Sequence, residues 1–254
     1  MDDRPDLAAL AAVARDVASE WGIRLGSRFP LARYSFVAPA GDDAVLKVTP
    51  PEDDESDEEA FALELWSGDG AVRILRHDPS RRALLMERLR PGTDLSVLDE
   101  ERATAVAVDV GLRLWRPATT PFRWIGDHVP GWLDRAHPCP AQALRPLAWR
   151  IFGSLDVGRA TLVHGDFHHH NLLASGSRYV AIDPKPMLGE PEFDVASFLW
   201  NPLGYRMRLD LTERRLAAFA AAGLDEARMR AWAVIRGVCL GADENETDVL
   251  RALL

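Results

Sequence analysis

The segment from residue 162 to residue 173 constrains this chain more than any other stretch of its sequence. It reads Leu-Val-His-Gly-Asp-Phe-His-His-His-Asn-Leu-Leu, so one apolar pair leads into a tight loop containing Gly165 and a second apolar pair leaves it. The loop carries Asp166 and, five positions later, Asn171. A carboxylate and an amide are therefore expected on a short loop between two packed elements.

A second carboxylate, Asp183, ends a predicted strand in the sequence Ala-Ile-Asp-Pro-Lys that begins at Ala181. Phosphoryl transfer needs one carboxylate to orient the acceptor hydroxyl and take its proton, and hard oxygen ligands to hold Mg²⁺ against the phosphates. The two segments together match that chemistry. Taken singly, an Asp before Pro is more often a turn former.

The first part of the chain is predicted to mix strands with helices. Helical spacing predicts a helix from Leu7 to Trp21 that Gly22 ends, and a second helix that the acidic run 52–59 opens and that continues to Trp66. Gly68 and Gly70 end the second helix. Strands are predicted at 34–38 and 44–48 around a turn at 40–43, and two further short apolar runs lie at 71–75 and 83–86.

The spacing of apolar residues changes after Pro91-Gly92, from short strand-like runs to a spacing typical of helices. Helices are predicted at 100–115, 144–155, 212–222, 226–240 and 247–254, with a compact segment of short strands at 161–182. The sequence thus predicts an α+β chain with a strand-rich part at residues 1–90 and a mainly helical part at residues 91–254.

Composition excludes several classes of protein. The net charge of −9 disfavours a nucleic-acid partner and suits a cationic ligand. Cys139 and Cys239 lie far apart and are expected to be reduced thiols. The N-terminus resembles no targeting peptide, and no apolar run reaches the ~20 residues that a membrane span needs. We therefore expect a cytoplasmic protein without a membrane partner.

The H-G-D-x-x-x-x-N loop followed by I-D-P resembles the aminoglycoside phosphotransferases, distant relatives of protein kinases. The longer stretch AIDPKPMLGEPEFDVA, followed by LWNP, is similar to the branch of streptomycin 6-phosphotransferases and hydroxyurea phosphotransferases. That branch also tends to show stretches like LWSGDGAVRIL and LLMERL, and both occur here. The resemblance covers about residues 21–240. It implies a two-lobed protein-kinase-like fold, with ATP and Mg²⁺ as cofactors. The small antiparallel-sheet N-lobe at residues 1–90 would bind the nucleotide, and the mainly helical C-lobe at residues 91–254 would carry the catalytic loop and the acceptor site.

The resemblance also implies roles for individual residues. Asp166 would be the catalytic base, and Asn171 and Asp183 the magnesium ligands. Lys47 would contact the α- and β-phosphates of the nucleotide, with Glu59 as its ion-pair partner. Glu58 and Glu55 are alternatives for that partner, because the sequence alone does not show which glutamate of the acidic run faces Lys47. Asp194 resembles the aspartate that supports the catalytic loop from behind.

The nucleotide-binding part shows one match and one departure. Met86-Glu87-Arg88-Leu89 resembles the hinge, where adenine would bond to the backbone of Glu87 and Leu89. The family usually covers the phosphates with a loop rich in Gly and Ser, but this chain has FPLARYSF at 29–36 and no glycine after Gly26. Ser35 and Arg33 are the residues there that we expect to contribute contacts.

The triplet His168-His169-His170 could suggest zinc, but consecutive residues point in different directions and no Cys or further His lies nearby at ligand spacing. We interpret the three as loop residues that flank the base, one of which touches the substrate.

The sequence therefore predicts a kinase that phosphorylates a hydroxyl of a small molecule, in the manner of an antibiotic-resistance enzyme acting on streptomycin. Acidic residues around Glu190 and Glu192 would favour a polycationic acceptor. A kinase for hydroxyurea or an ordinary metabolite is the alternative within the enzymes. A catalytically inactive nucleotide-binding regulator is the alternative outside them; the missing glycines favour it, and the intact Asp166, Asn171 and Asp183 oppose it.

Overall fold

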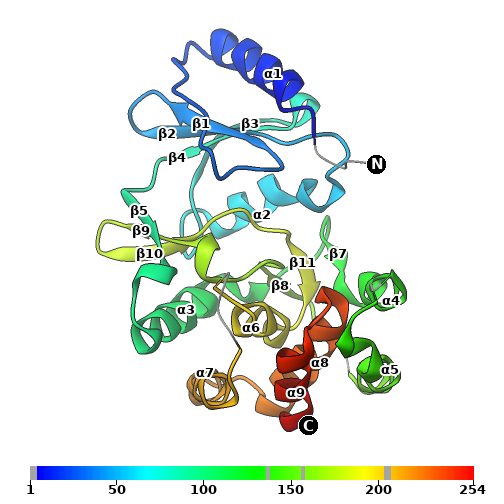
Figure 1. Ribbon diagram of the computed structural model, residues 1–254. Coiled ribbons are helices and arrows are strands. Elements are labelled where there is room, and N and C mark those ends of the chain that lie inside the picture. Colours follow the sequence, from blue (N-terminus) through cyan, green and yellow to red (C-terminus); the bar gives the residue numbers. More distant parts are fainter. Residues whose placement is uncertain (1–4, 136–137, 156–157, 203–206) are drawn as a thin grey trace. The chain divides into compact units, whose positions relative to one another are not determined.

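A computed structural model describes residues 5–135, 138–155, 158–202 and 207–254 of the chain (Figure 1). The contacts divide the chain into two compact units. Unit 1 comprises Met1–Thr93 and Leu173–Ile182, and unit 2 comprises Asp94–Leu172 and Asp183–Leu254. The sequence placed one boundary at residue 90 and assigned residues 173–182 to the helical part, whereas in the structure that short segment clusters with unit 1.

Unit 1 is built on an antiparallel sheet of order β1-β2-β4-β3. Its strands are β1 (Phe36–Ala40), β2 (Ala44–Val48), β3 (Ile74–Asp78) and β4 (Ala83–Glu87). The helix α1 (Leu7–Glu20) starts at Asp6, whose carboxylate accepts from two backbone amides of the first turn, and it packs on the sheet. The core between them is formed by Leu10, Ala14, Val17, Ala18, Phe36, Ala38, Ala40, Leu46, Val48 and Ala83.

The second helix of unit 1 is shorter than predicted. The acidic run forms a separate 3₁₀ turn, η1 (Asp54–Ser56), and α2 (Glu59–Trp66) begins only at Glu59. It ends at Ser67, which has φ +49°, followed by Gly68 at φ +82°. The first residues of the apolar run after it do not enter β3. Ala71 instead bridges Ala181, at the end of the hairpin β9 (Leu172–Ser175) and β10 (Arg178–Ala181), which pairs with β5 (Pro91–Asp94).

Unit 2 combines a small sheet of order β6-β8-β11-β7 with most of the helices. The strands are β6 (Arg116–Pro117), β7 (Arg123–Trp124), β8 (Thr161–Val163) and β11 (Met187–Gly189), with short 3₁₀ turns η3 (Leu95–Val97), η4 (Pro140–Leu144) and η5 (His169–Asn171). The helices are α3 (Glu100–Leu114), α4 (Ile125–Arg135), α5 (Arg145–Ser154), α6 (Pro191–Leu199), α7 (Leu209–Ala221), α8 (Glu226–Leu240) and α9 (Glu244–Ala252).

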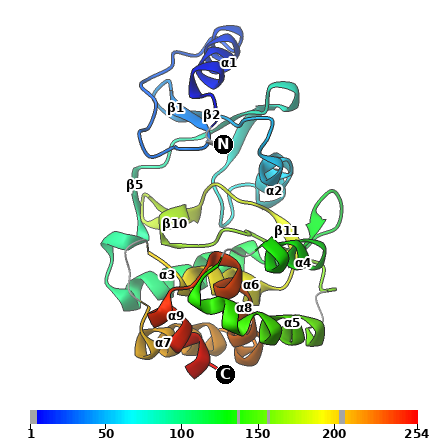
Figure 2. The same cartoon turned by 45° about the vertical axis from the view of Figure 1, so that its right-hand side comes forward.

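Helix α8 lies at the centre of unit 2, where it contacts α4, α5, α6, α7 and α9 (Figure 2). The predicted span of α8 agrees with the structure, and those of α3 and α5 agree to within one residue at each end. Helix α4 was not predicted, because Pro130 and two glycines interrupt its pattern. In the part of the chain that the structure describes, no helix is long and apolar enough to cross a membrane.

Candidate active site

The loop that carries Asp166 is held from below by a buried carboxylate. Asp194, on α6 and fully buried, accepts hydrogen bonds from the backbone amides of His164 (2.7 Å) and Gly165 (2.8 Å). The indole Nε1 of Trp115 donates to the same carboxylate at 2.9 Å. Burial raises the pKa of Asp194 to about 6, although these three donors favour its ionised form. Asp194 therefore supports the loop, as the family resemblance implied.

The same loop is pressed against the segment that follows Asp183. The amide of Lys185 donates to the carbonyl of His164 at 2.8 Å. Gly165 has φ +82°, and a Cβ built on it would lie 1.9 Å from the carbonyl oxygen of Lys185. Only glycine allows this close approach at a positive φ. The contact brings the Asp166 loop and the Asp183 segment together, although they are distant in sequence.

Asp166 is hydrogen-bonded to Asn171. The amide Nδ2 of Asn171 donates to the backbone oxygen of Asp166 at 2.9 Å and to its Oδ2 at 3.3 Å. Burial opposes the charge on Asp166, but the contact with His168 and the charges of His168, Lys185 and His164 outweigh it and hold the pKa of Asp166 well below its usual range. The carboxylate is thus ionised at neutral pH.

Asp183 follows β10 and is exposed. Its φ of +55° lies in the left-handed region that non-glycine residues seldom adopt. Strain of this kind concentrates at functional sites, because surrounding structure must hold it there. The structure therefore places an exposed carboxylate in a constrained backbone conformation two residues before the contact with Gly165.

The three histidines of the loop have different surroundings, although the rings of His168 and His170 contact each other edge to face at a centroid distance of 5.9 Å. His169 is buried and stacks on Phe198 at a centroid distance of 4.2 Å, whereas Nδ1 of His170 lies 2.8 Å from Oδ2 of Asp94. His168 faces Asp166, with Nε2 3.6 Å from Oδ1. Within the described residues, no group of three or more His, Cys, Asp or Glu side chains is arranged to hold a metal ion.

In unit 1, Lys47 and Glu59 form a buried ion pair. Nζ of Lys47, on β2, lies 2.6 Å from Oε2 of Glu59, the first residue of α2, and both side chains are at least 95% buried. Of the three acidic residues that the sequence left open, Glu59 is therefore a partner of Lys47. Glu58 occupies the N-cap of α2, and Glu55 lies in η1.

The predicted hinge segment continues from β4. The amides of Glu87 and Arg88 donate to the carbonyls of Arg73 and Asp43 at 2.9 and 2.8 Å, and Oε1 of Glu87 accepts from the amide of Arg73. Met86 lies within β4 and is buried. Among the described residues, nothing accepts a hydrogen bond from the amide of Leu89.

The segment before β1 is closed by its own hydrogen bonds. The amide of Phe29 donates to the carbonyl of Val37 at 2.8 Å, and the guanidinium of Arg28 donates to the carbonyl of Ala32. Ser35 is half-buried in the bend directly before β1, and Arg33 is exposed. This arrangement needs no glycine-rich turn, in agreement with the departure seen in the sequence.

Glu190 and Glu192, two of the acidic residues expected to attract a polycationic acceptor, are instead buried, so that expectation is wrong for these two. Glu190 pairs with Arg228 and accepts from the indole of Trp232 at 2.5 Å. Oε1 of Glu192 accepts from the amide of Asp225 at 3.2 Å. These contacts join the start of α6 to α8, because buried carboxylates need donors in place of water.

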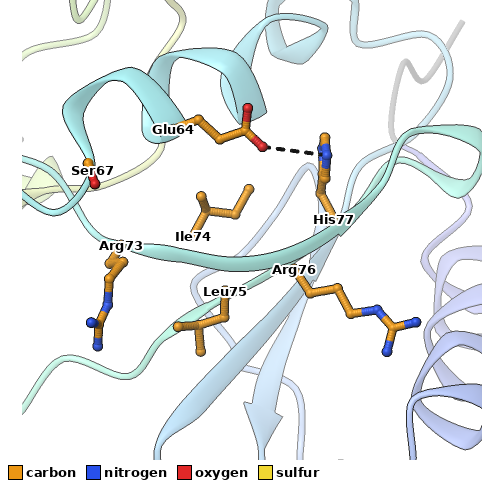
Figure 3. A pocket seen from close by; sticks show the side chains of 7 residues that line it. All are labelled: Glu64, Ser67, Arg73, Ile74, Leu75, Arg76 and His77. Atoms are coloured by element: carbon orange, nitrogen blue, oxygen red, sulfur yellow. Dashed lines mark ion pairs between the residues drawn. The ribbon is translucent and has the colours of Figure 1, made fainter.

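A hollow of about 450 Å³ lies on unit 1 between the end of α2 and β3 (Figure 3). Both charged and apolar side chains line the hollow. Nε2 of His77 points toward Oε1 of Glu64 on α2, 3.6 Å away. Leu75 and Arg76 point away from α2, and the guanidinium of Arg76 lies over the ring of Trp21 at 4.5 Å. The charged groups here contact protein groups, so the hollow is a less suitable site for chemistry than the Asp166 loop.

Comparison with known proteins shows which family has this arrangement. The family model described as aminoglycoside/hydroxyurea antibiotic resistance kinase matches residues 32–248. The chain belongs to this family. It is 30% identical to a streptomycin 6-kinase of Streptomyces glaucescens, over 89% of this chain and 80% of the relative. It is 34% identical to a hydroxyurea phosphotransferase of Kitasatospora aureofaciens, over 86% and 68%.

Among solved structures, the family member resembles the aminoglycoside phosphotransferase APH(4)-Ia in complex with ADP and hygromycin B. The TM-score is 0.59 at 18% identity, and the match covers 95% of this chain and 97% of the other. The antiparallel sheet of unit 1 and the helices of unit 2 are thus those of the protein-kinase-like fold. This family member is a small-molecule kinase.

Sequence reasoning identified Asp166, Asn171, Asp183 and Asp194 but gave no role to Trp115 or to one particular histidine of the triplet. Trp115 lies 79 residues before Asp194, so no local pattern could reveal the bond between them. His168 could not have been singled out either, because residues 165, 166 and 168 lie in bends, where no regular spacing shows which side chain faces Asp166.

Proposed function

We propose that this kinase transfers the γ-phosphoryl group of ATP, bound with Mg²⁺, to a hydroxyl of a small molecule, with Asp166 as the base. One observation carries the proposal. Asp166 and Asn171 are hydrogen-bonded on one loop, and the Lys185–His164 bond holds the segment containing Asp183 beside that loop. Phosphoryl transfer relies on such positioning and on electrostatics more than on covalent chemistry.

The residues fit a magnesium ion. The two shortest contacts of the Asn171 amide nitrogen are with Asp166, which leaves the carbonyl oxygen of Asn171 as the atom suited to a metal. The exposed carboxylate of Asp183 supplies a second hard oxygen. Mg²⁺ typically takes one or two protein carboxylates and completes its shell with phosphates and water, and when bound it neutralises phosphate charge.

Asp166 would accept the proton of the acceptor hydroxyl. Its lowered pKa makes it a weak base, so it takes the proton late, when the hydroxyl oxygen is already bonding to phosphorus and has become acidic. Until then the carboxylate acts mainly by orienting the hydroxyl as a hydrogen-bond acceptor.

Unit 1 would bind the nucleotide. Lys47 would contact the α- and β-phosphates, with Glu59 keeping the ammonium in place. The amide of Leu89 and the carbonyl of Glu87 suit the edge of adenine, beside the buried Met86. Ser35 would add a hydroxyl contact to the phosphates.

For the acceptor we propose a streptomycin-like aminocyclitol. Support comes from the 30% identity with the Streptomyces glaucescens streptomycin 6-kinase and from the net charge of −9. Hydroxyurea is the second candidate, because the relative of that name is 34% identical. Product mass spectrometry over streptomycin, hydroxyurea and common metabolites tests this choice, and no phosphorylated streptomycin would remove the first candidate.

Two variants separate an active kinase from a nucleotide-binding regulator. Asp183→Asn replaces an anionic ligand with a neutral one, so binding of Mg²⁺·ATP and turnover should both fall. Asp166→Asn should leave Mg²⁺·ATP affinity near that of the parent while kcat collapses by about 10²–10⁴-fold. Calorimetry with ATP and product detection measure the two effects. Parental turnover in Asp166→Asn would place the base elsewhere.

A further inference from the structure

His168 is the member of the histidine triplet that reaches the candidate base. Its ring faces Asp166, whereas the ring of His169 is buried and stacks on Phe198. Nε2 of His168 lies 3.6 Å from Oδ1 of Asp166 and 3.4 Å from Nδ2 of Asn171. The imidazole therefore touches both residues of the loop that the proposed function uses.

Nδ2 of Asn171 has three polar neighbours but only two hydrogens. Its two shorter contacts are with the backbone oxygen of Asp166 (2.9 Å) and with Oδ2 of Asp166 (3.3 Å), and the longest is with Nε2 of His168 (3.4 Å). We assign the two hydrogens to the two oxygens, because a charged carboxylate oxygen is a stronger acceptor than a neutral ring nitrogen. With this assignment Nε2 of His168 is able to carry the imidazole hydrogen.

The carboxylate of Asp166 selects the tautomer of His168. Nδ1 of His168 is buried and has no hydrogen-bond partner within the described residues, so it carries the cost of an unpaired polar atom whether or not it holds the hydrogen. At Nε2 the two tautomers differ, because a hydrogen there faces Oδ1 of Asp166 at 3.6 Å, whereas a lone pair there would be repelled by the negative oxygen. The neutral ring is thus more stable with its hydrogen on Nε2.

We propose that His168 is a positioning residue that donates from Nε2 to Oδ1 of Asp166. Together with Asn171 on Oδ2, it would hold the carboxylate from both sides. Each carboxylate oxygen has two lone pairs, so one on each oxygen stays available to the acceptor hydroxyl. The 3.6 Å separation is longer than a hydrogen bond, and we expect it to shorten when the acceptor binds, as catalytic hydrogen bonds commonly do.

This inference rests on the proposed function, and it predicts an effect on turnover that is separate from nucleotide binding. His168→Phe keeps an aromatic ring without a donor, and we expect kcat with the acceptor to fall about 100-fold while the KM for ATP stays near the parental value. His168→Gln restores a donor at a similar reach and should recover kcat to within about tenfold.

The matched control is His170→Phe, which makes the same change two positions away in a residue that contacts Asp94. The ring of His170 also packs edge to face against the ring of His168 at a centroid distance of 5.9 Å, and phenylalanine keeps a ring at that position. The control should leave kcat within about threefold of the parent, because His168 keeps both its packing and its contact with Asp166. A double-mutant cycle adds a second control: in an Asp166→Asn background, His168→Phe should change kcat little.

Crystal structures of the parent and of both His168 variants show the orientation of the Asp166 carboxylate and so test the inference without an activity assay. In the parent and in His168→Gln, the Asp166 carboxylate should keep its Oδ2 on Asn171, and in His168→Phe it should rotate away. An unchanged carboxylate in His168→Phe overturns the inference, as does equal loss of kcat in the Phe and Gln variants. If the parent phosphorylates no acceptor, the proposed function fails, and the crystal structures still decide the role of His168.

Discussion

Replacing Gly165 with alanine tests how the catalytic loop is held. At φ +82° an alanine costs about 1–2 kcal/mol in backbone strain. Its Cβ would also lie 1.9 Å from the Lys185 carbonyl oxygen, and such contacts are essentially never closer than 3.0 Å, so one backbone segment must move by about 1 Å. The overpacking adds about 1–3 kcal/mol.

The matched control is Gly176→Ala, in the exposed turn between β9 and β10. Gly176 has φ +61°, and a Cβ added there would have nothing within 4 Å. Alanine at this position therefore introduces the backbone strain of a positive φ but no steric clash. We expect Gly176→Ala to cost about 1–2 kcal/mol and Gly165→Ala about 2–5 kcal/mol.

Thermal unfolding and kinetics measure the difference. Gly165→Ala should lower the Tm by about 5–15 °C and kcat by about 100-fold, because a 1 Å displacement of Asp166 spoils its alignment. Gly176→Ala should lower the Tm by a few degrees and leave kcat near the parental value. If the two variants behave alike, the contact between Gly165 and Lys185 does not hold the loop, and the reasoning is refuted.

Three further predictions concern buried groups. Lys47→Ala should reduce kcat/KM for ATP by orders of magnitude and lower the Tm, because it removes the ammonium beside buried Glu59; Lys47→Met with Glu59→Leu should recover the Tm but not ATP use. Burial lowers the pKa of His169 to about 3, so without Mg²⁺ this one residue should contribute a loss of a few kcal/mol of stability as pH falls from 6.5 toward 3. His169→Leu should lose less over that range, as measured by urea unfolding. Burial raises the pKa of the Cys239 thiol to about 11, so iodoacetamide at pH 8 should modify it much more slowly than it modifies glutathione.

The order of signals along the chain was sufficient to predict the class of fold. Apolar residues at helical spacing predicted α8, and the short apolar run at 44–48 predicted β2. The start of α2 was misplaced, because an acidic run favours a helix N-terminus without specifying which residue begins it. The choice of Glu59 was nevertheless possible from its place before Trp66.

Contacts between distant segments decided the rest. The sequence by itself determined the chemistry available: the Asp166, Asn171 and Asp183 set, Lys47, and the glycine that a tight loop requires. Only the tertiary structure decided that Glu190 and Glu192 are buried against α8, that Trp115 supports Asp194, and that residues 173–182 belong with unit 1. The physical reason is that periodicity and turn residues act within a few positions, whereas burial and hydrogen-bond partners depend on which segments pack together.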